Sequence, residues 1–221
     1  MKQMPSTINI MIVDDHDLVR HGLKSLLSSQ EGIEVVAEAS SGEQAIDYCR
    51  NNAGTLDVIM MDINMPGIGG LEATQRIHAS WKDIGIIIVS VHGGDGPLPK
   101  KLINGGARGY LSKGNKLEEM VTAIHDVHAG GCYIAKDIAQ KLVLSELSGE
   151  TTPLDSLSQR ELQVLMMIAQ GKKNHIISDS LNLSPKTIST YRKRLHEKLD
   201  VSSDIEMLLL AIKYDILDSV K

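Results

Sequence analysis

The chain has 221 residues, of which 42% are hydrophobic and 23% charged, and its formal net charge is −5. These values are ordinary for one or two globular domains, and no apolar run reaches the roughly 18 residues that a membrane-spanning helix needs. Two cysteines without metal-binding or redox spacing, and residues 1–7 without a signal-peptide core, predict a cytoplasmic protein with free, buried thiols.

The first 130 residues alternate between short apolar runs and stretches with helical spacing. The apolar runs lie at about residues 8–13, 33–39, 56–61, 84–90 and 107–112. Between them, apolar residues recur every three or four positions, and we expect Asp17 and Asn115 to cap the first and last of these helices. Strands that are apolar throughout and alternate with helices are typical of a parallel sheet covered on both faces. We therefore predict a five-stranded, doubly wound α/β domain.

Two stretches rich in Gly, Ser, Thr and Pro interrupt this regularity. Residues 93–99 (GGDGPLP) predict a mobile loop before a helix at about 98–105. Residues 148–155 (SGETTPLD) are typical of a linker after a short helix at 138–147. Four helices without strands are then expected at about 158–170, 174–181, 185–199 and 203–216. The chain divides into an α/β domain at 1–130, a linker at 131–152 and an all-α domain at 153–221.

Four of the apolar runs end in residues that can carry chemistry. Asp14 and Asp15 follow the first run, Asp62 the third, Ser90 ends the fourth, and Lys113 follows the fifth. The C-terminal ends of parallel strands are where open α/β sheets place their ligands. Three carboxylates at one edge need a cation, and oxygen ligands suit Mg²⁺. A carboxylate can also accept a phosphoryl group, with a lysine and a hydroxyl binding its oxygens.

These strand ends resemble the receiver domain of two-component response regulators over residues 8–128. The motifs that carry the resemblance are residues 12–16 (IVDDH), 61–67 (MDINMPG), 88–90 (IVS) and 109–113 (GYLSK). The resemblance implies a flavodoxin-like fold in which Asp62 accepts a phosphoryl group from a sensor histidine kinase. Two features depart from the common pattern: Lys113 precedes Gly114 rather than Pro, and residues 93–96 are unusually rich in Gly.

The same resemblance assigns roles to the other residues of the site. Asp15 would bind Mg²⁺ directly, Asp14 would assist, and Asp62 and the main-chain carbonyl of Asn64 would complete the protein ligands. Lys113 would bind the phosphoryl group. Ser90 and Tyr110 would move together as the switch.

The second half of the chain concentrates positive charge in one helix. Residues 1–150 carry 13 Lys and Arg against 19 Asp and Glu, whereas residues 172–198 carry seven basic residues against two acidic ones. Ser184 and Pro185 predict a helix start, after which Ile188 and Leu195 belong to an apolar face and the other face is basic. A helix of this kind can enter the major groove of DNA.

Residues 153–217 resemble the helix-turn-helix domain of the LuxR/FixJ (NarL) class, most closely in the GacA/UvrY/LetA group. The carrying motifs are residues 157–162 (LSQREL), 168–171 (IAQG), 183–188 (LSPKTI) and the helix 184–199 (SPKTISTYRKRLHEKL). By position, the candidates for base contacts are Ser189, Thr190 and Lys193. The candidates for phosphate contacts are Lys173, Asn174, Lys186, Arg192 and Arg194. The last helix would supply contacts within a homodimer, and the receiver domain is a second surface through which two copies could pair.

Together these features predict a DNA-binding response regulator that needs Mg²⁺ and is not an enzyme. A phosphatase is the first alternative, but such enzymes usually carry a second aspartate two residues after the nucleophile, where this chain has Asn64. Only slow self-dephosphorylation is expected. A phosphorylation-gated interaction module without a DNA role is the second alternative, and the basic stripe at 172–198 argues against it. Whether phosphorylation acts by release of the DNA-binding helix or by dimerisation stays open.

Overall fold

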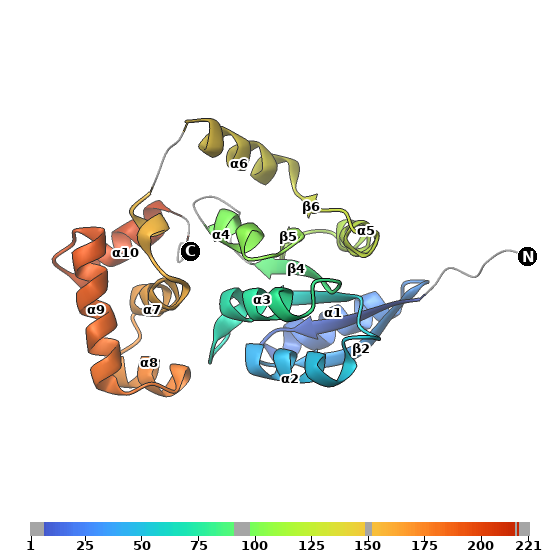
Figure 1. Ribbon diagram of the computed structural model, residues 1–221, viewed down its shortest axis with the longest axis horizontal. Coiled ribbons are helices and arrows are strands. Elements are labelled where there is room, and N and C mark those ends of the chain that lie inside the picture. Colours follow the sequence, from blue (N-terminus) through green and yellow to red (C-terminus); the bar gives the residue numbers. More distant parts are fainter. Residues whose placement is uncertain (1–6, 91–97, 149–151, 215, 217–221) are drawn as a thin grey trace, which may run out of the picture. The chain divides into compact units, whose positions relative to one another are not determined.

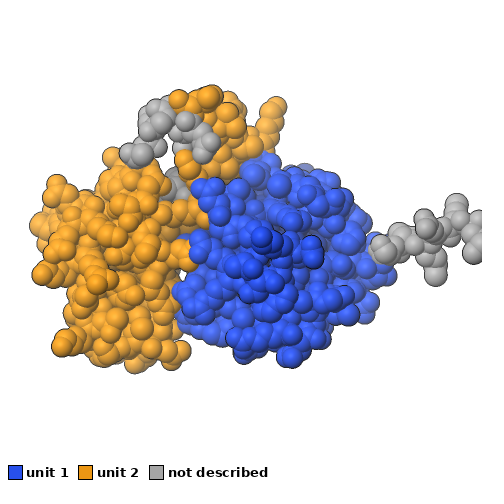
Figure 2. Space-filling model, in the orientation of Figure 1, with its two compact units in different colours: residues 1–90, 102–135 blue, residues 91–101, 136–221 orange. Residues whose placement is uncertain are grey.

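The structure, a computed structural model of the chain, describes residues 7–90, 98–148, 152–214 and 216. The predicted loop at 93–99 lies, up to residue 97, outside the described residues, as does the middle of the predicted linker at 149–151. The chain divides into two compact units, residues 1–90 with 102–135, and residues 91–101 with 136–221 (Figure 2). Within the described ranges, no helix has the length and apolarity needed to cross a membrane.

The first unit is a parallel sheet flanked by helices (Figure 1). Its strands are β1 (Ile8–Val13), β2 (Ile33–Ala39), β3 (Val58–Asp62), β4 (Gly85–Ser90), β5 (Gly109–Ser112) and β6 (Tyr133–Ile134). Its helices are α1 (Asp17–Ser28), α2 (Gly42–Asn52), α3 (Gly69–Ser80), α4 (Leu98–Asn104) and α5 (Leu117–His128), and the division between the units falls within α4. The predicted fold class is confirmed.

The strand order β2-β1-β3-β4-β5-β6 is that of a flavodoxin-like sheet with one added edge strand. All neighbouring strands pair in parallel. The prediction of five strands was wrong, because the sheet has a sixth strand, β6. This strand has two residues and no apolar run that the sequence could display. In this order the chain reverses direction at β1 and β3, so a crevice is expected at their C-terminal ends.

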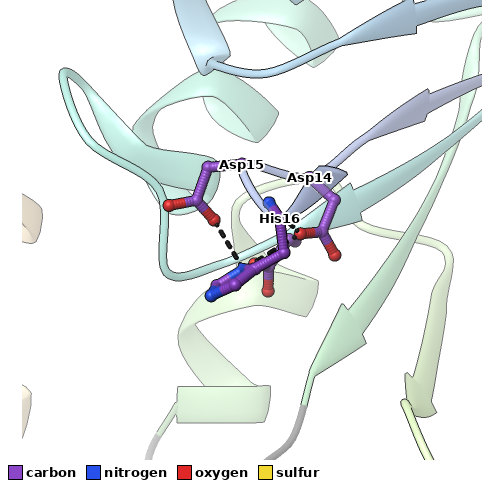
Figure 3. A group of neighbouring side chains, drawn as sticks. Asp14, Asp15 and His16 are labelled. Carbon is purple, nitrogen blue, oxygen red and sulfur yellow. Dashed lines mark hydrogen bonds and ion pairs between the residues drawn. The ribbon is translucent and has the colours of Figure 1, made fainter. Parts of the chain in front are cut away.

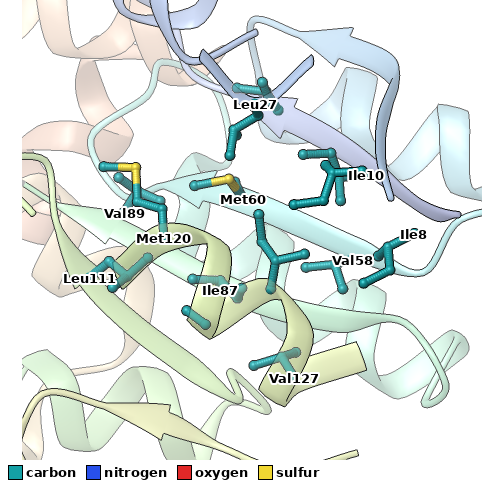
Figure 4. Close-up of a cluster of buried hydrophobic side chains, with 14 residues drawn as sticks. Ile8, Ile10, Leu27, Val58, Met60, Ile87, Val89, Leu111, Met120 and Val127 are labelled. Atoms are coloured by element: carbon teal, nitrogen blue, oxygen red, sulfur yellow. The ribbon is translucent and has the colours of Figure 1, made fainter. Parts of the chain in front are cut away.

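Alternate residues of the central strands build the core on each face of the sheet. Ile8, Ile10 and Ile12 of β1 share one buried cluster with Leu27 of α1 and Val127 of α5 (Figure 4). The residues between them face the opposite side, where α2 and α3 pack against each other and contact β2 and β3. Burial on both faces explains why these strands read as apolar throughout.

Two predicted helix caps are wrong by one residue, for a local reason in each case. His16, not Asp17, is the N-cap of α1, because His16 has extended backbone and Asp17 is already the first helical residue; the Asp17 carboxylate accepts a hydrogen bond from Arg20. Lys116 is the N-cap of α5, and its N–H donates to Glu119. Asn115 supports this arrangement by donating to the same carboxylate.

The second unit holds the remaining helices. They are α6 (Lys136–Ser148), a short 3₁₀ helix (Pro153–Ser156), α7 (Gln159–Ala169), α8 (Asn174–Leu181), α9 (Pro185–Leu199) and α10 (Asp204–Lys213). α7 packs against α8, α9 and α10, and α8 packs against α9, which is the arrangement of a helix-turn-helix domain. Ser184 caps α9 by accepting a hydrogen bond from the N–H of Thr187, as the sequence predicts.

An ion pair between a buried carboxylate and an exposed lysine joins the beginning of α7 to the end of α9. Glu161 is 3% exposed, and it accepts hydrogen bonds from the Ser158 N–H at 2.8 Å and from the Lys198 ammonium at 2.7 Å. Burial alone would raise the pKa of Glu161, but these two donors more than offset it and leave its pKa below the usual value.

The two cysteines are free, as predicted, and neither lies in a metal site of the described residues. Cys49 is buried in α2, where burial raises the pKa of its thiol to about 11. It is therefore a protonated core residue at neutral pH. The prediction of a buried thiol was wrong for Cys132, which is exposed because it follows Gly130 and Gly131 in the connection after α5.

Candidate functional site

The register of the sheet brings the predicted site residues to one edge. Val13 pairs with Met61, so Asp14 and Asp62 follow side by side on β1 and β3. Ser90 pairs with Ser112 at the ends of β4 and β5, and the Lys113 N–H donates to the Ser90 carbonyl at 2.7 Å. Residues that are far apart in the chain thus meet at the crevice expected from the strand order.

Lys113 lies between the two buried carboxylates of this edge. Its ammonium is 2.7 Å from Oδ2 of Asp14 and 3.1 Å from Oδ2 of Asp62, and both aspartates are only 3% exposed. The other oxygen of Asp62 accepts a hydrogen bond from the Ile63 N–H at 2.8 Å. One ammonium therefore compensates two buried negative charges, which leaves this edge of the sheet short of positive charge.

The titration of these groups reflects this deficit. Burial, reinforced by the neighbouring charge of Asp14, raises the pKa of Asp62 above its usual value, although Lys113 opposes the shift. Burial lowers the pKa of Lys113, but hydrogen bonding and charge from Asp14 and Asp62 more than offset it and leave its pKa raised. A carboxylate with a raised pKa in a crevice is a candidate for chemistry.

His16 belongs to the same cluster, which the sequence did not predict. Its Nδ1 lies 3.0 Å from Oδ1 of Asp15 and 3.2 Å from Oδ1 of Asp14, and its main-chain N–H donates to Asp14 (Figure 3). The signal for this role is the place of His16 directly after two aspartates. The side chain of His16 is 64% exposed, whereas Asp14 beside it is buried.

The cluster fits a hard divalent cation. One ligand atom each from Asp14, Asp15, His16 and Asp62 can be chosen so that all lie within 4.8 Å of one another. In addition, Oδ1 of Asp15 and Oδ2 of Asp62 are buried oxygens that accept no well-aligned hydrogen bond from the described residues. Lys113 lies 3.1 Å from the Asp62 oxygen and Nδ1 of His16 lies 3.0 Å from the Asp15 oxygen, and carboxylate oxygens of this kind are the ligands that Mg²⁺ prefers. The arrangement is therefore compatible with a metal site built on the aspartates.

Three further predicted residues lie close to this cluster in the chain or the sheet. Asn64 is two residues after Asp62, in the loop between β3 and α3. Ser90 is 1% exposed at the end of β4, and Tyr110 is fully buried on β5, where it pairs with Ile88. Ser90 and Tyr110 thus lie on neighbouring strands beside the carboxylate edge.

The second candidate surface is the solvent side of α9. Lys186, Ser189, Thr190, Lys193 and Arg194 are all exposed, while Ile188, Leu195 and Leu199 are buried. The hydroxyls of Ser189 and Thr190 donate to main-chain carbonyls one turn earlier, at 3.1 and 3.0 Å. Among the described residues, the charged partner of Lys193 is the exposed Glu197, at 3.8 Å. This face combines small polar side chains with free positive charge.

The structure distinguishes Arg192 from the other basic residues of α9. Its side chain is 20% exposed and forms an ion pair with Asp204 at the beginning of α10. Lys173 is exposed at the N-cap of α8, and Asn174, the first residue of that helix, is half-buried. Of the expected phosphate contacts, Lys173, Lys186 and Arg194 are therefore the exposed ones.

Comparison with known proteins agrees with both surfaces. The family model of the response regulator receiver domain matches residues 10–125, and that of bacterial regulatory proteins of the luxR family matches residues 155–211. The chain is 50% identical to the response regulator UvrY of Escherichia coli over 211 residues, which are 95% of each chain. It is 47% identical to the response regulator GacA of Pseudomonas aeruginosa over 214 residues, 96% of this chain and 99% of that one. The chain belongs to the two-component response regulators of the LuxR class. It is a DNA-binding transcriptional regulator.

Solved structures support the fold of this response regulator. A two-component response regulator of the LuxR family from an Aurantimonas species is 36% identical, with a TM-score of 0.59 over 64% of this chain and 99% of that chain. The RcsB response regulator of Salmonella typhimurium superimposes with a TM-score of 0.72 over 95% of this chain and 99% of that chain, at 24% identity. The second likeness concerns the fold alone.

Proposed function

We propose that Asp62 is the phosphoacceptor of this response regulator, and that its phosphorylation controls the binding of promoter DNA by α9. The observation that carries this proposal is the buried Asp62 carboxylate beside Asp14, with Lys113 bridging the two. A buried carboxylate at an edge short of positive charge is suited to accept a phosphoryl group that arrives with a cation.

In this proposal Asp14, Asp15, Asp62 and the main-chain carbonyl of Asn64 hold Mg²⁺. When bound, the ion neutralises phosphoryl oxygens during transfer. The proposal rests on the donor set, which consists of carboxylate oxygens, and on the two buried oxygens without aligned donors.

The donor is a phosphohistidine of a sensor histidine kinase. An Asp62 oxygen forms a bond to phosphorus while the phosphorus–nitrogen bond breaks, and the electron pair leaves with the imidazole. Lys113, already 3.1 Å from Asp62, then binds a phosphoryl oxygen. Asn64 stands where a phosphatase would place its second carboxylate, so only slow self-dephosphorylation follows.

Ser90 and Tyr110 transmit the change in this scheme. Ser90 ends β4 beside the residue that precedes Lys113, and Tyr110 is buried two residues earlier on β5. Movement of the Ser90 hydroxyl toward the phosphoryl group would open space that the Tyr110 ring then occupies. Tyr110 lies on β5, the strand that Lys113 directly follows, so a change at the phosphoryl group and a change of the ring would be coupled through one strand.

The proposed organisation is a receiver at 1–130, a linker at 131–152 and a DNA-binding domain at 153–221. Ser189, Thr190 and Lys193 contact bases, while Lys173, Asn174, Lys186, Arg192 and Arg194 contact phosphates. The regulator acts in the cytoplasm as a homodimer. The copies meet through α10, whose Ile205, Leu209 and Ile212 are exposed, and through the receiver as a second contact.

Intact-mass analysis tests the phosphoacceptor. The full chain is incubated with Mg²⁺ and acetyl phosphate, and wild type is compared with Asp62→Asn and Asp57→Asn. Asp57 is the matched control, because its carboxylate precedes the same strand but accepts a hydrogen bond from the Asn9 N–H instead. Wild type and Asp57→Asn should gain one phosphoryl group and Asp62→Asn none. An adduct on Asp62→Asn at the wild-type level would overturn the assignment.

A gel-shift titration tests the DNA-binding face. Promoter fragments of the host genome are titrated with acetyl-phosphate-treated protein at several salt concentrations. Binding should weaken steeply with salt, because Lys and Arg that neutralise phosphates release counterions. Unchanged mobility of every fragment, with or without phosphorylation, would favour an interaction module without a DNA role.

A further inference from the structure

Arg20 of α1 is largely buried, although arginine is usually an exposed residue. Its side chain is 12% exposed, and its guanidinium donates to the main-chain carbonyl of Asp14 at 2.8 Å. It also donates to Asp17 at 2.5 Å and lies 3.6 Å from a carboxylate oxygen of Glu38. Burial of a guanidinium is costly, and two hydrogen-bond acceptors together with the nearby Glu38 carboxylate offset that cost.

These contacts fix the turn that carries the first two metal-binding candidates. The N–H of Asp14 donates to the Ala39 carbonyl of β2 at 3.1 Å, and its carbonyl accepts from Arg20. Both main-chain groups of Asp14 are thereby held. Glu38 anchors the guanidinium to β2 and is itself held by Lys24 at 2.5 Å.

The hydrogen bond from Arg20 reaches the main chain of Asp14 and not its carboxylate. Oδ1 of Asp14 instead accepts from the His16 N–H, and Oδ2 faces Lys113. Arg20 therefore orients the turn while the carboxylate oxygens stay within the cluster. Its positive charge also lies next to an edge of the sheet that is short of compensating charge.

We propose that Arg20 is a positioning residue of the phosphorylation site, which holds the Asp14–Asp15 turn in the geometry that binds Mg²⁺. The inference rests on the proposed function, since it assigns the ion to this turn. Residues that orient the ligands of a metal typically contribute about 10- to 100-fold to its affinity.

The chain offers a matched control on α2. Arg50 pairs with Asp47 at 2.6 Å, three residues earlier, just as Arg20 pairs with Asp17. The Arg50 side chain is 65% exposed and contacts no part of the acidic cluster among the described residues. Arg50→Met therefore removes the same kind of helix ion pair without touching the turn.

The experiment compares wild type, Arg20→Met, Arg20→Lys and Arg50→Met in three measurements on the full chain. These are the Kd for Mg²⁺ by calorimetric titration of the unphosphorylated protein, the rate of adduct formation from acetyl phosphate, and the Tm without metal. Arg20→Met should weaken Mg²⁺ binding about tenfold and slow adduct formation at subsaturating Mg²⁺. Arg20→Lys, which can still donate one hydrogen bond, should recover part of the affinity, and Arg50→Met should leave it unchanged.

A lower Tm of Arg20→Met with an unchanged Kd for Mg²⁺ would overturn the proposal, because Arg20 would then act on stability alone. If Arg20→Met does not fold, Arg20→Lys is judged against Arg50→Lys by the same criterion. Wild type that gains no phosphoryl group on Asp62 would refute the proposed function. An unchanged Mg²⁺ affinity in Arg20→Met, with wild type phosphorylated normally, would refute the role of Arg20 alone.

Discussion

The ammonium of Lys113 lies 3.1 Å from the carboxylate of Asp62, and the same ammonium is shared with Asp14 at 2.7 Å. Both aspartates are buried, so the pair carries one negative charge more than its single cation compensates. The folded receiver therefore bears an electrostatic cost at its functional edge that a metal ion or the loss of one carboxylate would relieve. Function at this edge is in conflict with the stability of the metal-free domain.

Asp62→Asn should for this reason stabilise the metal-free protein at neutral pH. The pKa of Asp62 is raised in the folded state by burial and by Asp14, so its ionisation disfavours folding above the ordinary pKa. As the pH falls through the raised pKa, folded wild type takes up the proton and this penalty disappears. The Tm of Asp62→Asn in EDTA should exceed that of wild type at pH 7, by roughly 3–4 °C for each ~1 kcal/mol, and the gap should close as the pH falls.

Thermal denaturation at a series of pH values measures this, with Asp57→Asn as the control for loss of a carboxylate on the same segment. Saturating Mg²⁺ should also reduce the difference in Tm between the two proteins. A ligand at 100 times its Kd adds about 2.7 kcal/mol to the free energy of unfolding of the wild type that binds it. A lower Tm for Asp62→Asn than for wild type at pH 7 in EDTA would contradict the electrostatic argument.

Gly70→Ala should displace Asp62, because the added methyl group would collide with the main chain of that residue. A Cβ at position 70 would lie 1.9 Å from the Asp62 carbonyl oxygen, and the Gly70 N–H donates to the Ile63 carbonyl at 3.0 Å. Neither contact can relax without moving Asp62 or the beginning of α3. We expect a loss of about 2 kcal/mol or more in stability, together with slower adduct formation on Asp62.

Gly54→Ala is the control, since a Cβ there meets no atom within 4 Å and its φ is not positive. Chemical denaturation gives the stability of both variants, and intact mass gives the adduct. A Gly70→Ala protein with the stability and phosphorylation rate of Gly54→Ala would show that the turn accommodates the methyl group.

The carboxylate edge was predictable because it depends on two properties that a sequence displays. Apolar β-branched runs mark the strands of a covered parallel sheet, and such sheets gather their C-terminal ends at one edge. Asp14, Asp62 and Lys113 each end a run, so their convergence follows from topology. The short strand β6 has no such pattern, and it forms because Tyr133 and Ile134 pair with Gly109 and Tyr110.

The roles of two arginines were not predictable, because each depends on a partner that only the folded chain brings close. In the sequence, Arg20 is one charged residue among several on a helix. Its partner Glu38 comes close to it only when β2 packs beside α1. Arg192 belongs by spacing to the basic face of α9, yet the packing of the second unit pairs it with Asp204. Helical periodicity gives the direction of a side chain around its own helix, and it carries no information on which neighbouring helix lies there.

Arg194→Met and Arg192→Met should therefore differ in their effect on DNA binding. Arg194 is exposed and free to neutralise a phosphate, so its loss should lower the salt slope of binding to a random-sequence duplex by about 1. Arg192 is one-fifth exposed and paired, so Arg192→Met should change the slope less and lower the Tm instead. Anisotropy titrations over a salt series supply the slopes. Equal slope losses for the two variants would mean that Arg192 leaves Asp204 when DNA binds.

Leu209→Glu should separate dimerisation from folding. Ile205, Leu209 and Ile212 follow one another at helical spacing on α10 and are 70%, 59% and 47% exposed, so none is needed to fill the core of its own copy. A charge at the centre of this stripe should prevent two copies from meeting there, while the free energy of unfolding changes by less than about 0.5 kcal/mol.

Sedimentation of the phosphorylated protein on a duplex selected by wild type from a random library should give two copies per duplex for wild type and one for Leu209→Glu. Leu144→Glu on α6, where the side chain is 57% exposed, controls for a charge placed on an exposed apolar residue and should keep two. Two copies per duplex for Leu209→Glu, at wild-type affinity, would exclude α10 as the contact and leave the receiver as the route to the dimer.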